Sequence, residues 1–328
     1  MSCISNYRIL PAQLDTQWDQ FVKQSKTSTP FSLSSFILPL NTHYQAYYCT
    51  KGDERVAGLL LLLDSAGKRV TGHDLVVHDG VFFKDFKSLN KAQTYSEQFK
   101  ALQCIAEFLA SEFSETVLTL PPSIQDIRPF LWVNYHEPLP MFSESVRYTS
   151  FIDIAEFRLE RSLEACELYS QASVSRRQQI RYGLKKGIKV EPSQSIDLFL
   201  SLYESTFIRQ GVALRETLIP EMRALLTSLN EQGDIRIFEA KNVQGQTGSI
   251  AIFLLLNDSA YYLFGANDYD LRHQHMGTMV LWEAFYRLAA EGINKVDLEG
   301  VNSPDRGWFK LSFGGTLNPY YSLHFESK

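Results

Sequence analysis

Residues that could carry out chemistry are concentrated in one stretch near the end of the sequence, VDLEGVNSPDRGWFKLSFGG, residues 296–315. Its chemically useful side chains are three acids and a lysine that follows two aromatic residues: Asp297, Glu299, Asp305, Lys310, Trp308 and Phe309. A carboxylate can take up a proton, and a fixed ammonium group can stabilise a negative charge that develops on a substrate. A purely structural interpretation also fits, with a strand, a turn and an amphipathic helical turn whose Trp and Phe belong to the core.

Comparison of the sequence with itself singles out the lysine. With a constant shift of 179 positions, residues 101–143 align with residues 280–322 without a gap, and nine of the 43 aligned positions are identical. A helical pattern, a strand, an acid and a Phe recur in the same order, which indicates an internal duplication. Lys310 aligns with Leu131, which carries no charge. We therefore expect the chemistry to lie in the second copy.

A second candidate site is the loop Arg272-His273-Gln274-His275-Met276-Gly277-Thr278, which joins a predicted strand to a predicted helix. The N–H groups and dipole of a helix N-terminus attract anions, and Arg272 and the glycine at position 277 would suit a pyrophosphate. The first copy has Gln98 at the position of that glycine. The spacing of Gln274 and Gly277 resembles the pyrophosphate loop of GNAT acyltransferases, although Met279 stands where that loop has a small residue. Arg272, Gln274, Gly277 and Thr278 are thus candidate cofactor-binding residues, and an ordinary strand-to-helix turn is the alternative.

The segment 175–189 is predicted to be a helix with six positive charges. Arg177, Arg181 and Lys185 follow one another at intervals of four and therefore lie on one face of that helix. Such a stripe can neutralise the phosphates of tRNA or of a nucleotide-linked substrate. Tyr182 is the only aromatic residue among them, so sequence-specific reading of RNA bases is not expected. A solvated helix face is the alternative.

Length and composition limit the other possibilities. At 328 residues the chain is too long for one ordinary core, so we expect two domains, residues 1–150 and 151–328. The longest aliphatic run, residues 59–63, is too short to span a bilayer, and the N-terminal residues lack the pattern of a secretory signal. We therefore predict a cytoplasmic protein with no membrane span. The net charge of −5 gives no general attraction to polyanions, so any such site has to be local.

The cysteines give no sign of a metal centre or of a disulfide framework. Cys3, Cys49, Cys104 and Cys166 lie far apart, and no C-x-x-C motif occurs. None of the four lies in a glycine-rich turn of the kind that presents a nucleophile, so a catalytic Cys-His pair is not favoured. We expect buried thiols, no metal and no tightly bound cofactor.

Hydrophobic periodicity predicts a mixed α/β chain. The expected helices are residues 15–24, 93–113, 196–209, 217–230 and 276–291. The expected strands are residues 44–50, 55–63, 116–120, 235–240, 248–256, 259–265 and 295–298. Helices followed by strands, a helix and a strand recur in both halves of the chain, as the duplication requires.

Several motifs together resemble the FemABX aminoacyltransferases and the wider FemAB-like acyltransferases, which consist of two tandem GNAT-like domains. The motifs extend over most of the chain: Trp18-x-x-Phe21-Val22, Thr29-Pro30-Phe31, Lys186-Gly187-Ile188-Lys189-Val190, Tyr261-Tyr262-Leu263-Phe264-Gly265-Ala266, Asp297-Leu298-x-Gly300 and Phe309-Lys310-x-x-Phe313-Gly314. The last of these is the most specific. The resemblance implies an α/β (α+β) fold with two GNAT-like domains, each a mixed central sheet flanked by helices, of which the N-terminal one is degenerate.

The resemblance also implies roles for individual residues. The lysine that matches Lys310 is implicated in catalysis in that family, and an arginine and a tyrosine that match Arg215 and Tyr262 help to hold a UDP-muramoyl-peptide. Ile219 stands where the family has a further tyrosine, and the chain lacks the coiled-coil arm that some relatives use near tRNA.

The reaction implied by the resemblance is transfer of an acyl or aminoacyl group to an amine. Lys310 would stabilise the oxyanion, Trp308 and Phe309 would exclude water, and Asp297, Glu299 or Asp305 would take the amine proton. Arg177 and Arg181 would contact the substrate. The co-substrate would be acyl-CoA or aminoacyl-tRNA, and the acceptor a small-molecule, sugar or nucleotide-linked precursor of the cell envelope, such as a peptidoglycan precursor. The protein would be a monomer or a homodimer. A non-catalytic binding protein on a degenerate GNAT scaffold is the alternative.

Overall fold

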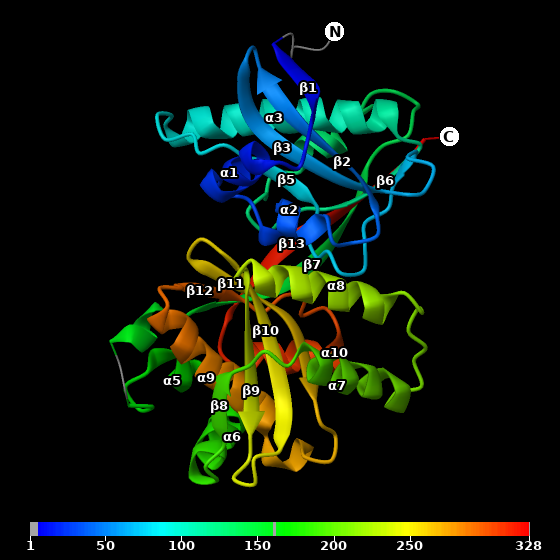
Figure 1. Cartoon of the computed structure of the whole chain (residues 1–328). Coiled ribbons are helices and arrows are strands. Elements are labelled where there is room, and N and C mark those ends of the chain that lie inside the picture. The colour runs from blue at the N-terminus through cyan, green and yellow to red at the C-terminus, as the bar shows by residue number, and fades with distance from the viewer. Residues whose placement is uncertain (1–5, 160–161, 328) are drawn as a thin grey trace. The chain divides into compact units, whose positions relative to one another are not determined.

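The chain forms two compact units in a computed structural model that describes residues 6–159 and 162–327 (Figure 1). Unit 1 consists of Met1–Arg147 and Pro319–Lys328, and unit 2 of Tyr148–Asn318. These units differ from the expected domains 1–150 and 151–328, because residues 319–328 at the C-terminus belong to unit 1, where they form part of a strand. Cys3 lies outside the described residues, and Cys49, Cys104 and Cys166 are free thiols. In the described parts of the chain, no helix is long and apolar enough to cross a membrane.

Unit 1 is built on a sheet with the strand order β1-β2-β3-β4-β6-β13, and β5 pairs with β3 as a side branch. Neighbouring strands are antiparallel except for the parallel pair β4 and β6. The strands are β1 (Tyr7–Ala12), β2 (His43–Lys51), β3 (Glu54–Leu63), β4 (Arg69–Val70), β5 (Gly80–Phe83), β6 (Glu115–Thr119) and β13 (Thr316–Glu326). The α-helices are α1 (Thr16–Gln24), α2 (Ser34–Ile37), α3 (Lys91–Glu112) and α4 (Arg128–Leu131).

Unit 2 has a sheet with the strand order β7-β12-β11-β10-β9-β8. Here too one pair, β11 and β12, is parallel and the other neighbours are antiparallel. The strands are β7 (Ser143–Asp153), β8 (Lys189–Pro192), β9 (Ile235–Lys241), β10 (Thr247–Leu256), β11 (Ser259–Asn267) and β12 (Lys295–Asp297). The α-helices are α5 (Glu167–Gln171), α6 (Val174–Lys185), α7 (Ile196–Arg209), α8 (Leu218–Glu231), α9 (Met276–Ala290) and α10 (Pro304–Leu311).

The two sheets have the same order and the same strand directions, element for element. The strands β1, β2, β3, β4, β6 and β13 of unit 1 correspond to β8, β9, β10, β11, β12 and β7 of unit 2. The shift of 179 positions likewise brings β6 onto β12 and α4 onto α10. This agreement supports the internal duplication that the sequence indicates.

The last strand of each copy completes the sheet of the other unit. By sequence β7 ends the first copy, yet Phe151, Ile152 and Asp153 pair with β12 in unit 2. By sequence β13 ends the second copy, yet residues 322–326 pair with residues 115–119 of β6 in unit 1. Each strand buries apolar side chains in the unit that it enters, including Ile152 in unit 2 and Leu323 in unit 1. The exchange could not be read from hydrophobic periodicity, which is local.

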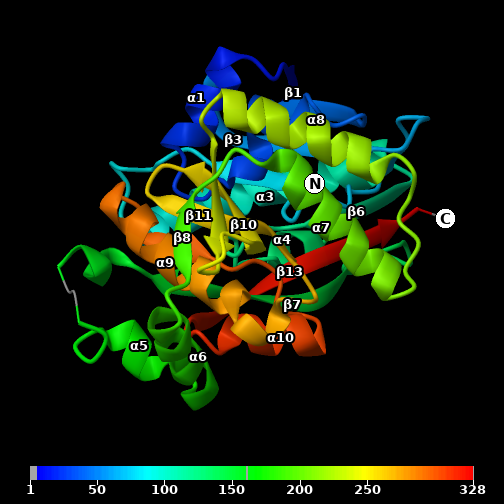
Figure 2. The same ribbon diagram turned by 60° about the horizontal axis from the view of Figure 1, so that its bottom comes forward.

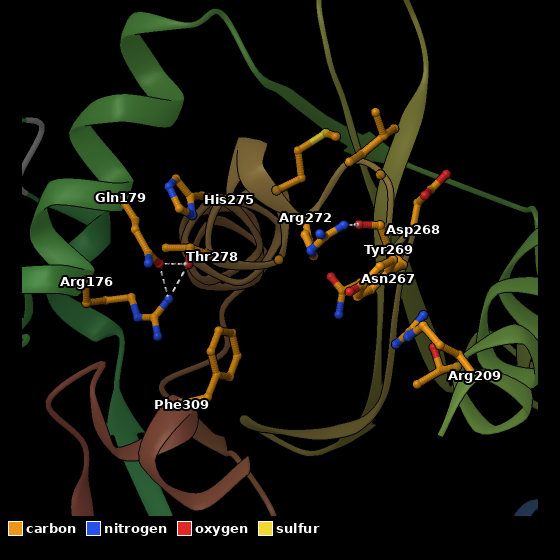
Figure 3. Close-up of a pocket in the computed structure, with 15 residues that line it drawn as sticks. Arg176, Gln179, Arg209, Asn267, Asp268, Tyr269, Arg272, His275, Thr278 and Phe309 are labelled. Atoms are coloured by element: carbon orange, nitrogen blue, oxygen red, sulfur yellow. Dashed lines mark hydrogen bonds between the residues drawn. The ribbon is translucent and has the colours of Figure 1, made fainter. Parts of the chain in front are cut away.

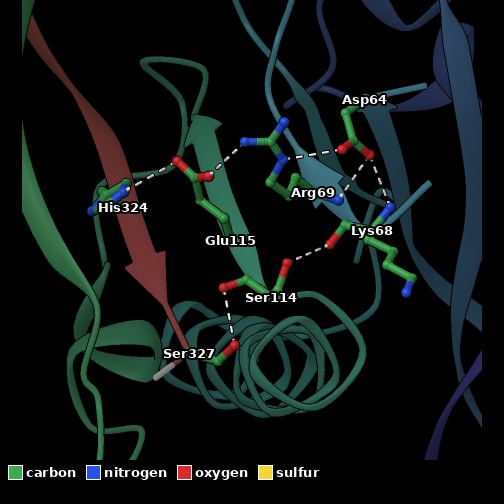
Figure 4. Close-up of polar contacts among 7 residues, drawn as sticks. All are labelled: Asp64, Lys68, Arg69, Ser114, Glu115, His324 and Ser327. Atoms are coloured by element: carbon green, nitrogen blue, oxygen red, sulfur yellow. Dashed lines mark hydrogen bonds and ion pairs between the residues drawn. The ribbon is translucent and has the colours of Figure 1, made fainter. Parts of the chain in front are cut away.

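Polar contacts also hold the C-terminal strand in unit 1 (Figure 4). The backbone N–H and the hydroxyl of Ser327 donate to the carbonyl oxygen of Ser114 at 2.8 and 3.0 Å. His324 lies 3.6 Å from Glu115, whose other oxygen lies 3.6 Å from the guanidinium of Arg69. These groups are exposed enough that the ion pairs contribute little, so burial of apolar side chains is the main attachment.

In unit 2, helices cover both faces of the sheet (Figures 1 and 2). Helix α9 is almost wholly apolar and packs with α6 against β9 and β10. The aromatic side chains Phe199 and Tyr203 of α7 pack against Phe264 on β11. A β-bulge adds Leu263 to β11, because Ile252 pairs with Phe264 while Phe253 pairs with Tyr262. The bulge therefore turns Tyr262 towards the α9 side and Phe264 towards α7.

The attachment of β13 to unit 1 gives a prediction with a matched control in the same strand. Leu323 is fully buried, whereas Leu317 is 49% exposed. Leu323→Ala should lower the free energy of unfolding by about 2–5 kcal/mol, because it leaves a cavity in the core of unit 1. Leu317→Ala should change it by no more than about 0.5 kcal/mol. Urea denaturation measures both, and equal effects of the two substitutions would contradict this placement of β13.

Candidate functional site

A pocket of about 340 Å³ opens in unit 2 beside the N-terminus of α9 (Figure 3). Its walls come from α6, the end of α7, the connection between β11 and α9, and α10, and include Arg176, Arg209, Tyr269, Arg272, Thr278 and Phe309. Three predicted cofactor-binding residues, Arg272, Gly277 and Thr278, thus line one pocket. Gln274, in the short 3₁₀ turn before α9, does not line it.

The chain leaves the start of α9 open towards this pocket. His275, the residue before the helix, has a left-handed backbone with φ of 58°, and no side chain caps the first N–H groups. Uncapped N–H groups at a helix N-terminus favour a negatively charged partner. A Cβ atom at Gly277 would lie 2.7 Å from the amide oxygen of Asn267, so glycine lets these two elements approach closely.

Two exposed arginines lie on one side of the pocket, and both contact the ring of a tyrosine. The guanidinium groups of Arg209 and Arg272 lie 4.2 and 3.7 Å from the ring centre of Tyr269. Arg272 also donates a hydrogen bond of 2.6 Å to the carbonyl oxygen of Tyr269. Cation–π contacts fix both guanidinium groups near the mouth without neutralising their charge.

A third arginine, Arg176, lies on the opposite side of the pocket (Figure 3) and is only 6% exposed. Its Nε donates to Ser312 at 2.9 Å, and its Nη1 donates to Gln179 at 2.6 Å and to Thr278. The rings of Phe309 and Phe313 lie 4.4 and 4.6 Å from the guanidinium carbon. Burial lowers the pKa of Arg176 to about 10, which still leaves it charged at neutral pH.

A second cluster of ionisable groups lies where β12 ends. Asp297 and Glu299 are 1% and 4% exposed, and Glu299 has a left-handed backbone with φ of 58°. Thr149 donates its hydroxyl to Oδ1 of Asp297, and the backbone N–H of Glu299 donates to the same oxygen at 2.8 Å. Oδ2 of Asp297 and both carboxyl oxygens of Glu299 have no hydrogen-bond partner among the described residues.

Lys310 brings a positive charge to these acids. Its Nζ lies 5.5 Å from the ring centre of Tyr262 and donates to the carbonyl oxygen of Gly300 at 3.3 Å. Burial lowers the pKa of Lys310, and the charges of Glu299 and Asp297 oppose that shift. One ammonium group therefore shares a buried region with two carboxyl groups.

Burial raises the pKa of both acids, but the neighbouring groups act on them differently. Burial raises the pKa of Asp297 to about 6, with the hydrogen bond from Thr149 acting in the opposite direction. Burial, together with the charge of Asp297, raises the pKa of Glu299 well above its usual range. Two carboxylates cannot both stay ionised beside one ammonium in such a site. Burial and the charge of Asp297 therefore favour the protonated, neutral form of Glu299, whereas Thr149 and Lys310 favour the ionised form of Asp297.

The structure separates the other predicted residues from this cluster. Asp305 and Trp308, three positions apart on α10, share its solvent-exposed face, and Trp308 is 75% exposed. Trp308 therefore does not exclude water from Lys310, and it is not a core residue either. Asp305 does not pair with Lys310, which lies on another side of the helix. Phe309 lines the pocket and packs against Arg176.

The remaining predicted substrate residues lie apart as well. Arg215 forms two hydrogen bonds of 2.8 and 2.6 Å with Glu221 and does not line the pocket. On α6, Arg181 and Lys185 are exposed and Arg177 is half-buried, as a solvated basic face requires. Tyr262 is the only one of the predicted substrate-binding residues that meets Lys310, and burial raises its pKa to about 12.

Four contributors were not predicted from the sequence: Thr149, Arg176, Arg209 and Tyr269. Thr149 lies about 150 positions before its partner Asp297 and reaches it only because β7 joins the sheet of unit 2. Arg176 stood in the basic segment, but a spacing of four from neighbouring charges drew attention to Arg177 instead. Arg176 precedes Arg177 by one position and therefore lies on the buried side of α6, together with Ile180 and Gly183. Hydrophobic periodicity could have indicated this side of the helix.

Comparisons with known proteins agree with the fold. Residues 174–308 match the family model described as an acetyltransferase (GNAT) domain. The chain is similar to the crystal structure of FemX, with a TM-score of 0.66, 15% identity and 96% of each chain covered. It is also similar to a tandem GNAT protein from the clavulanic acid biosynthesis pathway, with a TM-score of 0.51, 11% identity and 98% of each chain covered.

A further similar structure is L-PGS from Bacillus licheniformis, with a TM-score of 0.50, 13% identity, and coverage of 96% of this chain and 92% of that one. No curated protein sequence matches the chain. At such low identity the similar structures bear on the fold. The chain has the tandem GNAT-like α/β fold, and its resemblance to the FemAB-like proteins is confirmed.

The hydrogen bond from Thr149 gives a prediction about the acid pair. Thr149→Val removes a donor to the ionised form of Asp297, so the pKa of Asp297 should rise above about 6, by on the order of one pH unit. Thr149→Ser keeps the hydroxyl and should leave the pKa nearly unchanged. Carbon NMR of the labelled carboxyl group follows the titration. An unchanged or lowered pKa in the valine variant would contradict the role of Thr149.

Proposed function

We propose that the chain is an N-acyltransferase that uses both parts of unit 2, with the activated donor bound in the pocket and the acyl group transferred near Lys310. The observation that carries this proposal is the electropositive pocket at the uncapped start of α9. Three arginines line it, and the only acidic residue in its lining is Asp268. A phosphate-bearing donor such as acyl-CoA matches this combination of charge and free N–H groups.

The proposed reaction needs no covalent intermediate on the protein. The amine nitrogen attacks the acyl carbonyl carbon, a C–N bond forms, and the carbonyl oxygen becomes an oxyanion. The ammonium of Lys310, held in a region of low polarity, stabilises that charge more than it would in water. Collapse of the intermediate breaks the C–S bond of a thioester or the C–O bond of an ester. Alignment of both substrates supplies much of the remaining acceleration.

The amine proton needs an acceptor, and the acids are not equivalent. Asp297 has a pKa raised only to about 6 and an oxygen, Oδ2, without a hydrogen-bond partner among the described residues. Burial and the charge of Asp297 favour the protonated form of Glu299, which makes it the poorer proton acceptor, and Asp305 lies on the exposed face of α10. We therefore propose Asp297 as the base. The leaving thiolate or alkoxide takes up a proton as the product departs.

Aminoacyl-tRNA is the second candidate donor. The specific observation in its favour is the exposed basic face of α6, formed by Arg177, Arg181 and Lys185, because phosphate backbones bind to such stripes. The acceptor in this proposal is an amine of a sugar, peptide or nucleotide-linked precursor of the cell envelope, which the resemblance to FemAB-like proteins suggests.

Binding of the donor gives a prediction that requires no knowledge of the acceptor. CoA should raise the melting temperature of the wild-type protein, because a ligand that binds only the folded state stabilises it. Gly277→Glu should abolish that rise, since its side chain would collide with Asn267 and place a negative charge at the start of α9. Gln178→Glu adds the same charge on the exposed part of α6 and serves as the control.

The same series with uncharged tRNA distinguishes the donors. If tRNA stabilises the wild type, and Glu substitutions at Arg177, Arg181 and Lys185 remove that effect, aminoacyl-tRNA is favoured. If CoA acts and Gly277→Glu alone removes its effect, acyl-CoA is favoured. Absence of stabilisation by either compound would count against the proposed function.

Lys310 provides the prediction for the chemical step. Lys310→Met keeps the apolar stem and removes the ammonium, so turnover should fall on the order of 10²-fold or more if the oxyanion loses its stabilising charge. Leu131→Met, at the corresponding position of the first copy, should leave turnover nearly unchanged. Steady-state turnover with the donor found above measures both, and circular dichroism checks the fold. Wild-type turnover in Lys310→Met would exclude this role of the lysine.

A further inference from the structure

The pocket contains a buried positive charge that no acidic side chain neutralises. Arg176 is nine-tenths buried, and its hydrogen-bond partners are the neutral side chains of Gln179, Thr278 and Ser312. Within residues 6–159 and 162–327 no carboxylate forms an ion pair with it, and burial is the only influence that shifts its pKa. A buried charge without an opposite charge is costly, and proteins usually pair it.

The three partners leave one edge of the guanidinium group unused. Arginine has five N–H donors, and the bonds to Ser312, Gln179 and Thr278 occupy those on Nε and Nη1. The N–H groups of Nη2 have no acceptor among the described side chains and backbone. Nη2 is not among the fully buried atoms that lack a partner, so this edge is accessible, and Arg176 is one of the residues that line the pocket.

Aromatic packing and hydrogen bonds fix the orientation of this edge. The ring centres of Phe309 and Phe313 lie 4.4 and 4.6 Å from the guanidinium carbon. One neutral partner comes from α6, one from α9, and one from Ser312, the residue that follows α10. A planar fork held in this way binds an oxyanion with little further loss of conformational freedom. Lysine could not present such an edge.

Arg176 is also distinct from the arginines at the mouth. Figure 3 shows it beside Thr278 and Phe309, whereas Arg209 and Arg272 lie on the other side with Tyr269. The mouth arginines are exposed and their charge is screened by salt, but that of Arg176 is not. Phe309, which packs on Arg176, directly precedes Lys310 in α10.

We propose that Arg176 is a second, deep anion-binding position of the pocket, which takes a carboxylate or phosphate oxygen of the substrate through the Nη2 edge. It would select for substrates that carry an anionic group close to the acyl-transfer centre, in addition to any phosphate at the start of α9. The proposal rests on the proposed function only in taking this pocket as the substrate site. Anion binding by Arg176 can be tested without turnover.

The test compares two small oxyanions, inorganic phosphate and succinate, at fixed ionic strength. At least one of them should raise the melting temperature of the wild-type protein, and which one does so distinguishes the phosphate from the carboxylate source. Arg176→Met keeps an apolar stem beside the two phenylalanines and removes the charge. Its dissociation constant for that anion should rise on the order of 10²-fold, as loss of a charge-assisted hydrogen bond in a buried site predicts.

The variants also separate binding from a structural role. Without ligand, Arg176→Met should melt no lower than the wild type, because it removes an uncompensated buried charge, whereas a structural arginine would lower the melting temperature when replaced. Arg176→Lys retains a cation if the methionine variant does not fold, and it should lose on the order of 10-fold in affinity because it lacks the planar edge. Arg209→Met, at the exposed mouth, should lose less, with an effect that fades at high salt.

Two results would overturn the inference. One is a wild-type protein that neither anion stabilises. The other is unchanged anion affinity in Arg176→Met or Arg176→Lys. If anion binding depends on Arg176 but Lys310→Met keeps full turnover, the anion site stands and the proposed chemistry at Lys310 fails, so the two proposals are tested separately.

Discussion

Burial of charge is the constraint on which the arrangement of unit 2 depends. An ammonium or carboxylate group taken out of water loses several kcal/mol of hydration, and only an opposite charge or good hydrogen bonds restore it. At the end of β12 the restoration comes from opposite charge, because Lys310 favours the ionised form of Asp297, although Oδ2 of Asp297 and both carboxyl oxygens of Glu299 lack hydrogen-bond partners among the described residues. At Arg176 it is incomplete, because the partners are neutral. A cluster of opposite charges and a cation without an opposite charge thus flank the same helix, α10.

The strands explain why these charges can be held at all. β12 is short and lies between β11 and β7, so Asp297 leaves the sheet at a place where neighbours cover it on both sides. The bulge in β11 turns Tyr262 towards Lys310, and the left-handed backbone at Glu299 turns the chain back just after the sheet ends. The bulge and the left-handed residue are irregularities of the backbone, and proteins tolerate these mainly where they orient a particular side chain.

The sequence predicts the regular parts of this molecule well and the irregular parts poorly. The helices α3, α7, α8 and α9 and the strands β9 to β11 lie within a few residues of their expected ranges, because long periodic patterns are set by neighbours along the chain. Lys310 was predicted from the unequal copies of the duplication, and Asp297 and Glu299 from the residue types in the stretch 296–315. The exposure of Trp308 and Asp305 was not, since one amphipathic turn does not reveal which of its faces meets the core. Thr149 was beyond reach, because its partner depends on the exchange of β7.

The exchange of end strands has a consequence for how the protein is made. During synthesis the residues of unit 1 leave the ribosome first, but the sheet of unit 1 lacks β13 until all of unit 2 has been translated. Until then β6 has an unpaired edge, and the core around Leu118 and Phe130 lacks the side chains of Leu323 and Phe325. Exposed strand edges and incomplete cores promote aggregation. The nascent chain is therefore prone to aggregate for as long as the translation of unit 2 takes. Domains usually fold one after another on the ribosome, whereas here the first unit has to wait for the second.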